Sequence, residues 1–194
     1  MKRAFVVAVL LLCSACIQLG SDSVPMRHYL LQPNAAAEQI PLEGGVVVTL
    51  ESLRLPAYLD RLQLTTYDNQ NQVLVAKLDR WSEPLQEGFT RVLSENLLRH
   101  LEDGEGRSQS IQEVDKERFL VKLKINSFDG MLGQQTTVDI RWTIIKVGID
   151  GQVLQGHFVE TTPIGSSYPD LVKGLNLALN NLSYKIAREI VDFK

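Results

Sequence analysis

Apolar residues recur at three- and four-residue spacing in two stretches of the chain, and this spacing predicts two amphipathic helices. The first is expected to have Ser82 as its N-cap, Pro84 in its first turn and Gly104 as its C-terminal stop. The second is expected to open at Ser167, with Asp170 as the acid of a capping box. The residues predicted to be buried are Leu85, Phe89, Val92, Leu93, Leu97 and Leu101 in the first helix and Leu171, Leu175, Ala178, Leu179, Leu182, Ile186 and Ile190 in the second.

Around these helices apolar and polar residues alternate, which predicts strands with one buried face. The stretch 46–53 is apolar in both alternations, as in a strand that is covered on both faces. Turns are expected at 68–71, 129–130 and 150–151, and the first and last of these would close hairpins. The expected strands cover residues 28–31, 46–53, 62–67, 72–76, 119–126, 137–144 and 153–161.

The order of elements is four strands, a helix, about four strands and a second helix. Each helix has one apolar stripe to bury, and the half-polar strands offer one apolar face. The economical arrangement therefore places both helices on the same side of one sheet. We predict the α+β class, a two-layer sandwich in which two amphipathic helices pack on one face of a mixed or antiparallel β-sheet. Residues 28–194 are expected to form a single domain, because that length suits one hydrophobic core.

The chain begins with a short basic stretch, an apolar run at 4–12 and the sequence Cys13-Ser14-Ala15-Cys16. The run is too short to span a bilayer, which takes about 20 residues, and it has the form of a secretory signal. Small residues precede Cys16, whereas Cys13 follows a bulky leucine. We therefore interpret 1–15 as a removed lipoprotein signal peptide, Cys16 as the lipidated residue and 16–27 as its flexible tether.

Two alternatives accompany this interpretation of the N-terminus. One is an ordinary signal peptide with a chance cysteine. The other is a redox pair of Cys13 and Cys16, which is disfavoured because such motifs belong beside a βαβ unit. If Cys16 is triacylated, the anchor is firm, because several chains give stable attachment where one gives only marginal binding.

Composition and motifs exclude several other functions. The net charge is −3, and no basic patch has the scale that a nucleic-acid binder needs. The three histidines, His28, His100 and His157, lack metal-ligand spacing, and neither a nucleophile elbow nor a phosphate-binding glycine loop is present. We therefore expect no cofactor, no metal, no nucleic acid and no enzymatic activity.

One segment has the composition of a partner surface. Residues 55–61 hold two large apolar groups, an aromatic residue and a charge pair between two strands, and connecting segments usually run over the surface. Trp81 stands just before the first predicted helix, where packing as a lid over that helix is the alternative. Packing and partner contact remain equally open for Tyr58 and Leu59. The candidate partner or oligomer interface comprises Leu55, Pro56, Tyr58, Leu59, Asp60, Arg61 and Trp81.

Five stretches in this order, behind a lipoprotein signal, resemble the successive signatures of the ABC-type transport auxiliary lipoproteins, the PqiC-like family of the Pqi system. They are residues 29–33, 55–61, 81–85, 139–142 and 182–187. The resemblance implies a lipoprotein that faces the periplasm and forms a homo-oligomeric ring at the outer-membrane end of an Mce-type phospholipid transport system. Its partners would be an Mce-domain protein and the inner-membrane permease. Ile17 after the cysteine resembles an outer-membrane address.

Two other functions remain as alternatives to the transport accessory. One is an outer-membrane lipoprotein that activates a cell-wall synthase. The other is a periplasmic hydrolase with an unrecognised site. Neither has a motif in the sequence that favours it over the resemblance.

Overall fold

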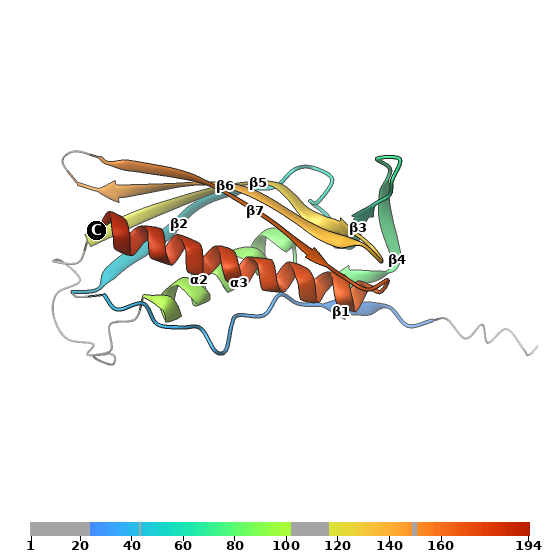
Figure 1. The fold of residues 1–194 in the computed structure, drawn as a ribbon. Coiled ribbons are helices and arrows are strands. Elements are labelled where there is room, and N and C mark those ends of the chain that lie inside the picture. Colours follow the sequence, from blue (N-terminus) through green and yellow to red (C-terminus); the bar gives the residue numbers. More distant parts are fainter. Residues whose placement is uncertain (1–23, 43, 102–116, 149–150) are drawn as a thin grey trace, which may run out of the picture.

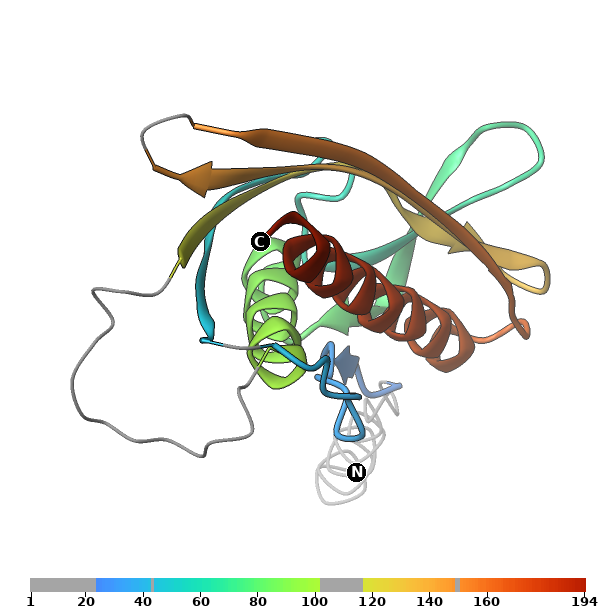
Figure 2. The ribbon, with the colours of Figure 1, turned by 60° about the vertical axis from the view of Figure 1, so that its left-hand side comes forward.

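A computed structural model describes residues 24–42, 44–101, 117–148 and 151–194. Two layers are plain in Figures 1 and 2: a long, twisted sheet lies over helices α2 (Leu85–His100) and α3 (Tyr168–Phe193). Both helices cover the same face of that sheet. The predicted α+β class, with two helices on one face of a mixed sheet, is confirmed.

The strands divide between two sheets, where one sheet was expected. The larger sheet has the order β2-β5-β6-β7, and only its β2–β5 pair is parallel. The smaller has the order β1-β4-β3, with β1 parallel to β4. Three strands, not about four, follow α2 among the described residues. The bounds are β1 Arg27–Tyr29, β2 Val46–Arg54, β3 Gln63–Tyr67, β4 Val73–Trp81, β5 Glu117–Met131, β6 Gln135–Val147 and β7 Val153–Pro163.

The hydrophobic core lies between the larger sheet and the helices. Every residue of the two predicted helical stripes is buried. Phe89 of α2 meets Phe128 of β5 edge-on, with ring centroids 5.3 Å apart, a favourable aromatic geometry. The predicted cap of α3 is also confirmed, because the Ser167 hydroxyl accepts a hydrogen bond from the Asp170 N–H at 3.3 Å.

The predicted cap of α2 is wrong. This helix begins at Leu85 with Pro84 as its N-cap, and no side chain caps it. Ser82 instead extends the pairing of β4 with β1, since its N–H donates to the Tyr29 carbonyl at 2.8 Å. Because this strand pairing holds the backbone of Ser82, Ser82 cannot take the N-cap position of α2. The predicted stop at Gly104 lies outside the described residues.

The predicted turn at Asp129-Gly130 is also wrong, because β5 continues through both residues to Met131. The chain turns two residues later, around Gly133, whose φ is +76°. Gly130 is needed for close packing instead. A Cβ there would lie 2.6 Å from the Gln135 carbonyl oxygen and 2.9 Å from the Leu171 side chain.

Strand β2 is not covered on both faces, as its composition suggested. Val46, Val48 and Leu50 turn toward α2 and are only partly buried, while Thr49 on the other face is exposed. The reason is that both helices lie on the other face of the larger sheet, so no layer of the described part of this chain covers the outer face of β2 (Figures 1 and 2).

The hairpin predictions fare better. Strands β3 and β4 pair antiparallel around the expected turn, where the Asp68 carboxylate accepts hydrogen bonds from the N–H groups of Gln70 and Gln72 at 2.8 and 2.9 Å. Strands β6 and β7 also pair antiparallel, with Ile145 opposite Val153. Asp150 of the predicted turn lies outside the described residues.

Candidate functional site

The predicted partner segment, residues 55–61, joins β2 to β3 as a compact turn. The Leu59 N–H donates to the Pro56 carbonyl at 3.0 Å, and the Arg61 N–H donates to the Leu59 carbonyl at 2.8 Å. Leu59 is buried, Leu55 and Pro56 are half-buried, and Asp60 and Arg61 are exposed. The charge pair is therefore the part of this turn that faces outward, while Leu59 contributes to the core.

Tyr58 bridges this turn to the larger sheet. Its hydroxyl donates a hydrogen bond to the carboxylate of Asp129 on β5. Burial raises the pKa of Asp129, although the hydrogen bond from Tyr58 opposes the shift. Burial and the bond to Asp129 also raise the pKa of Tyr58. A second hydrogen bond, 2.9 Å between the hydroxyls of Tyr67 and Thr137, joins β3 to β6. These contacts fasten the smaller sheet and its turn to the larger one.

Trp81 ends β4 and is buried, at 6% exposure. Its backbone N–H donates to the Leu62 carbonyl at 2.7 Å. The packing alternative therefore describes Trp81 in this chain. The partner role predicted for the outward-facing residues of 55–61 stays a prediction.

A charged cluster fixes the strand that follows the tether. Arg27 donates from Nε and Nη2 to the two carboxylate oxygens of Asp79, each at 2.7 Å, and the Tyr29 hydroxyl donates to the same carboxylate at 2.7 Å. Asp79 is buried, and the hydrogen bond from Arg27 is the largest cause that holds its pKa below the ordinary value. Burial and the bond to Asp79 raise the pKa of Tyr29 to about 12. The tether thus enters the fold at a well-bonded position.

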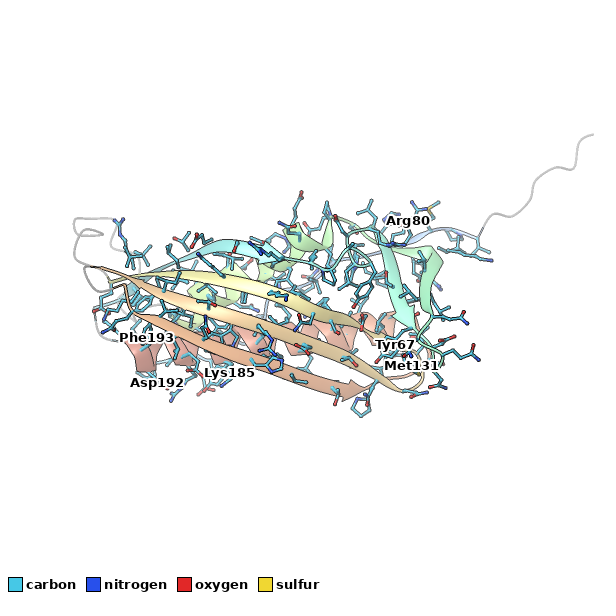
Figure 3. The ribbon with its side chains drawn as sticks, turned by 90° about the horizontal axis from the view of Figure 1, so that it is seen from above. Tyr67, Arg80, Met131, Lys185, Asp192 and Phe193 are labelled. Carbon is cyan, nitrogen blue, oxygen red and sulfur yellow. The ribbon has the colours of Figure 1, made fainter. Side chains whose placement is uncertain are left out.

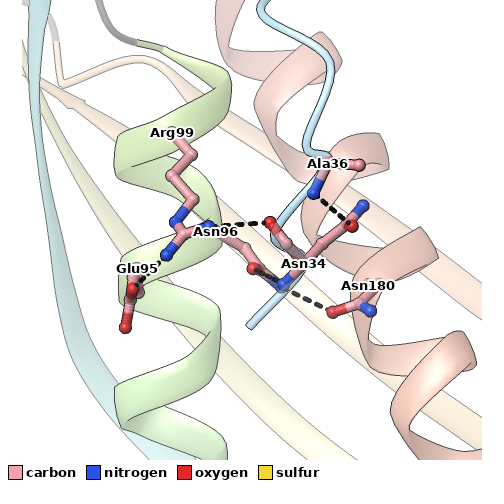
Figure 4. Close-up of polar contacts among 6 residues, drawn as sticks. All are labelled: Asn34, Ala36, Glu95, Asn96, Arg99 and Asn180. Carbon is pink, nitrogen blue, oxygen red and sulfur yellow. Dashed lines mark hydrogen bonds and ion pairs between the residues drawn. The ribbon is translucent and has the colours of Figure 1, made fainter. Parts of the chain in front are cut away.

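Beyond β1, the chain crosses both helices on the side away from the larger sheet, as the blue segment of Figure 1 shows. Figure 4 shows how polar side chains hold it there. The Asn34 N–H donates to Asn96 Oδ1 at 2.8 Å, and Asn96 Nδ2 donates to Asn180 at 2.8 Å and to Ser183 at 3.2 Å. Arg99 donates to the Asn34 carbonyl at 3.0 Å. We call residues 30–42 and these contacts the helix clamp.

The helix clamp continues at both ends of the segment. The Gln32 backbone exchanges two hydrogen bonds with the Asn176 side chain, at 2.7 and 3.0 Å. The Ile40 N–H donates to the His100 carbonyl at 2.8 Å, and His100 Nδ1 lies 2.6 Å from the Glu38 carbonyl. Sequence reasoning missed this clamp. Its signal was Asn96, a polar residue at a core-facing position of a helix, because buried polar groups nearly always have partners.

The outer face of the larger sheet carries a second feature that the sequence did not reveal. Arg54, Lys124, Arg141 and His157 lie directly opposite one another on β2, β5, β6 and β7, and we call them the cationic row. They line a shallow hollow of about 500 Å³. Figure 3 views this face from above, with the helices beneath it.

Acidic groups balance only part of the cationic row. The His157 ring lies 2.8 Å from the carboxylate of Asp139. Burial alone would raise the pKa of Asp139, but hydrogen bonds from Asn126 and His157 and the nearby charges of His157 and Arg141 outweigh burial and lower it. Arg54, Lys124 and Arg141 form no ion pair with any residue in the described part of the chain.

The described residues contain no group of three metal-ligating side chains. Nor is any helix of that part of the chain long and apolar enough to cross a membrane. The three histidines lie apart, His28 exposed on β1, His100 buried under the clamp and His157 in the cationic row. Cys16 lies outside the described residues, so its lipidation stays a prediction.

Comparison with known proteins places this architecture among α+β domains that have been solved before. The chain is similar to an uncharacterised protein of known crystal structure, with 21% identity and a TM-score of 0.65 over 86% of this chain and 99% of that one. It is also similar to a Xanthomonas campestris protein of the DUF330 family, with 12% identity and a TM-score of 0.56 over 82% of this chain and 91% of that one. Both likenesses support the fold.

The sequence itself defines the family. The model for ABC-type transport auxiliary lipoprotein components matches residues 29–187, which run from β1 to the last turns of α3. This chain belongs to that family, and the predicted resemblance is confirmed. No curated protein matches it. As a lipoprotein component of transport, the protein is membrane-anchored and faces the periplasm.

Proposed function

We propose that this protein is the outer-membrane-anchored accessory of an Mce-type, Pqi-like phospholipid transport system, and that it acts by docking and not by catalysis. The observation that carries the proposal is the family match over residues 29–187, which takes in both sheets and both helices. Its partners would be an Mce-domain protein and the inner-membrane permease, and it would assemble as a homo-oligomeric ring. The outer-membrane address rests on Ile17 after Cys16.

The helix clamp supports a docking role. A domain that docks a partner presents a defined surface when its own segments are held in one arrangement. Here the chain that leaves the tether is bonded by Arg27 and Tyr29 to the smaller sheet and by Asn34 to both helices through Asn96. The chain is therefore fixed to the folded domain from β1 onward.

The use of the buried carboxylates supports the absence of catalysis. Asp79 accepts three hydrogen bonds from Arg27 and Tyr29, and Asp129 is held by Tyr58. Both are at most 4% exposed. Carboxylates so placed hold elements together, whereas a general acid or base must reach a substrate.

The test uses the full chain with a C-terminal affinity tag in its own envelope. Membranes are separated on a density gradient, and the tagged protein is purified from the outer-membrane fraction after mild cross-linking. We expect an Mce-domain protein and a permease to co-purify, as identified by mass spectrometry. A tagged, unrelated outer-membrane lipoprotein is the control for chance capture. Enrichment of a cell-wall synthase in place of an Mce-domain protein would overturn the proposal in favour of the alternative.

A further inference from the structure

The cationic row is unusual because the like charges of Arg54, Lys124 and Arg141 stand directly opposite one another across three strands, with the ring of His157 next to them on the fourth. Adjacent strands lie about 4.8 Å apart, so the row spans about 14 Å. Like charges in directly opposed positions destabilise a sheet. The whole chain has a net charge of −3, so the positive charge of this row does not reflect an excess of cationic residues in the sequence. An anion bound across the row would offset the repulsion.

The rows beside it change from polar to apolar in one direction along the strands. The first holds hydroxyl and amide groups together with Lys122, which pairs with Glu51 at 3.2 Å. The second is mainly apolar and lies about 13 Å from the cationic row, because two same-face steps along a strand measure about 6.6 Å each. These rows are Ser52, Lys122, Thr143 and Gln155, and then Thr49, Leu120, Ile145 and Val153.

Apolar exposure continues past the second row. Val147 is 50% exposed and Val153 54% exposed, and Val47 lies in register with Arg118 and Val147 on the same face. This arrangement accounts for the composition of β2, which is apolar on both alternations although only its inner face meets α2. Large apolar side chains left uncovered beside a charged hollow indicate a ligand with both characters.

We propose that the outer face of the larger sheet binds one anionic phospholipid. The phosphate is held by Arg54, Lys124 and Arg141. One guanidinium group can donate two parallel hydrogen bonds to two phosphate oxygens, and lysine adds a point charge. Thr143 and Gln155 donate to the glycerol and ester oxygens. The acyl chains lie over the rows that contain Leu120, Ile145, Val147 and Val153.

Three observations favour this ligand over others. The hollow of about 500 Å³ has the size of a small-molecule site, whereas a protein segment needs a larger surface. Free phosphate would make no contact with the apolar rows. Membrane anchoring keeps the domain beside phospholipid headgroups. That the bound phospholipid is one that moves between the membranes rests on the proposed function. The binding experiment below tests the site itself, and its result does not depend on that function.

The test is native mass spectrometry of the full lipidated chain in maltoside micelles, titrated with phosphatidylglycerol. We expect phosphatidylglycerol to bind about tenfold or more tightly than phosphatidylcholine, whose choline cation is repelled by the cationic row, and than glycerol phosphate, which has no acyl chains to cover the apolar rows. Lys124→Gln with Arg141→Gln should weaken phosphatidylglycerol by about tenfold. The matched control is Lys77→Gln with Lys173→Gln, which removes the same charge from positions elsewhere on the surface and should change binding by less than about twofold.

A second pair of variants tests the acyl rows. Ile145→Thr with Val153→Thr keeps β-branched residues in the strands and should weaken phosphatidylglycerol while leaving glycerol phosphate unchanged. Equal phosphatidylglycerol binding by the lysine–arginine variant and its control would overturn the proposal. So would glycerol phosphate that binds as tightly as phosphatidylglycerol, or oligoglutamate that displaces the lipid, since each identifies another anion. If the unmodified chain binds no phosphatidylglycerol but still captures an Mce-domain protein, this inference alone is overturned.

Discussion

Replacing Tyr58 by phenylalanine removes only the hydroxyl that donates to Asp129 and keeps the ring that packs in the turn. Asp129 is 4% exposed, so water cannot take the place of the lost donor without opening the structure. A buried acceptor left without a partner costs about 1–3 kcal/mol, and more when it is charged. We expect Tyr58→Phe to lower the free energy of unfolding by about 2 kcal/mol near neutral pH. For a chain of 194 residues this lowers the thermal midpoint by about 4–8 °C.

The loss should depend on pH in a defined direction. Burial raises the pKa of Asp129 in the folded chain. As pH rises, the unfolded chain therefore releases this proton first, and the folded chain binds more protons between the two pKa values, so stability falls with rising pH across that window. The bond from Tyr58 opposes the shift. Without it the folded pKa rises further, so the deficit of Tyr58→Phe should grow as the pH rises above about 4, the ordinary pKa of an aspartate.

The assay is urea unfolding followed by circular dichroism at several pH values, with Asp129→Asn as the matched control. Asparagine keeps an acceptor for the Tyr58 hydroxyl but has no charge to bury. In a chain that already carries Asp129→Asn, the phenylalanine substitution should therefore cost less, and its cost should not vary with pH. A Tyr58→Phe deficit below about 0.5 kcal/mol, or one of equal size at every pH, would refute the reasoning.

Three further predictions concern the anchor, the core and the partner surface. Cys16→Ser should leave an unprocessed or unanchored form, and wild-type recovery with the outer membrane in fractionation would contradict the anchor. Leu182→Ala should lower the free energy of unfolding by about 2–5 kcal/mol in chemical denaturation, because Leu182 is fully buried, while the exposed Lys185→Ala should change it by less than about 0.5 kcal/mol. Asp60→Arg with Arg61→Asp keeps the net charge and should leave the melting temperature unchanged, but it should lower either the oligomer mass in light scattering or the capture of a partner. If oligomer mass and partner capture are both unchanged, this turn is not an interface.

The helices could be predicted because their evidence is local. A buried stripe repeats every three or four residues, and α3 has both a capping serine and an acid in its first turn, so Leu182 and its neighbours were placed correctly. Ser82 is followed by a proline in the same way as Ser167. It fails as a cap because its backbone is committed to Tyr29, far earlier in the chain, and no local pattern reports that pairing.

Side chains that serve long-range contacts misled in the same way. An Asp-Gly pair is a strong turn signal. Here, however, Asp129 accepts a hydrogen bond from the Tyr58 hydroxyl, and Gly130 leaves the space in which α3 packs closely. For Tyr58 the sequence left packing and partner contact equally open, because the residue that its hydroxyl contacts stands 71 positions along the chain. In each case a single tertiary contact explains the residue better than its local sequence does.

The cationic row lies furthest beyond sequence reasoning, and the cause is strand register. On its own strand each of these residues is an ordinary member of a solvent-facing alternation, and positions 54, 124, 141 and 157 do not stand together in the sequence. Pairing places Arg54 opposite Lys124 only because β2 carries an irregularity between Leu50 and Ser52. Shifting the β2–β5 pairing by one residue would turn Arg54 away from Lys124, since neighbouring residues of a strand point to opposite faces. The position of one bulge in β2 therefore decides whether Arg54 joins the proposed phosphate site or stands apart from it as a separate surface charge.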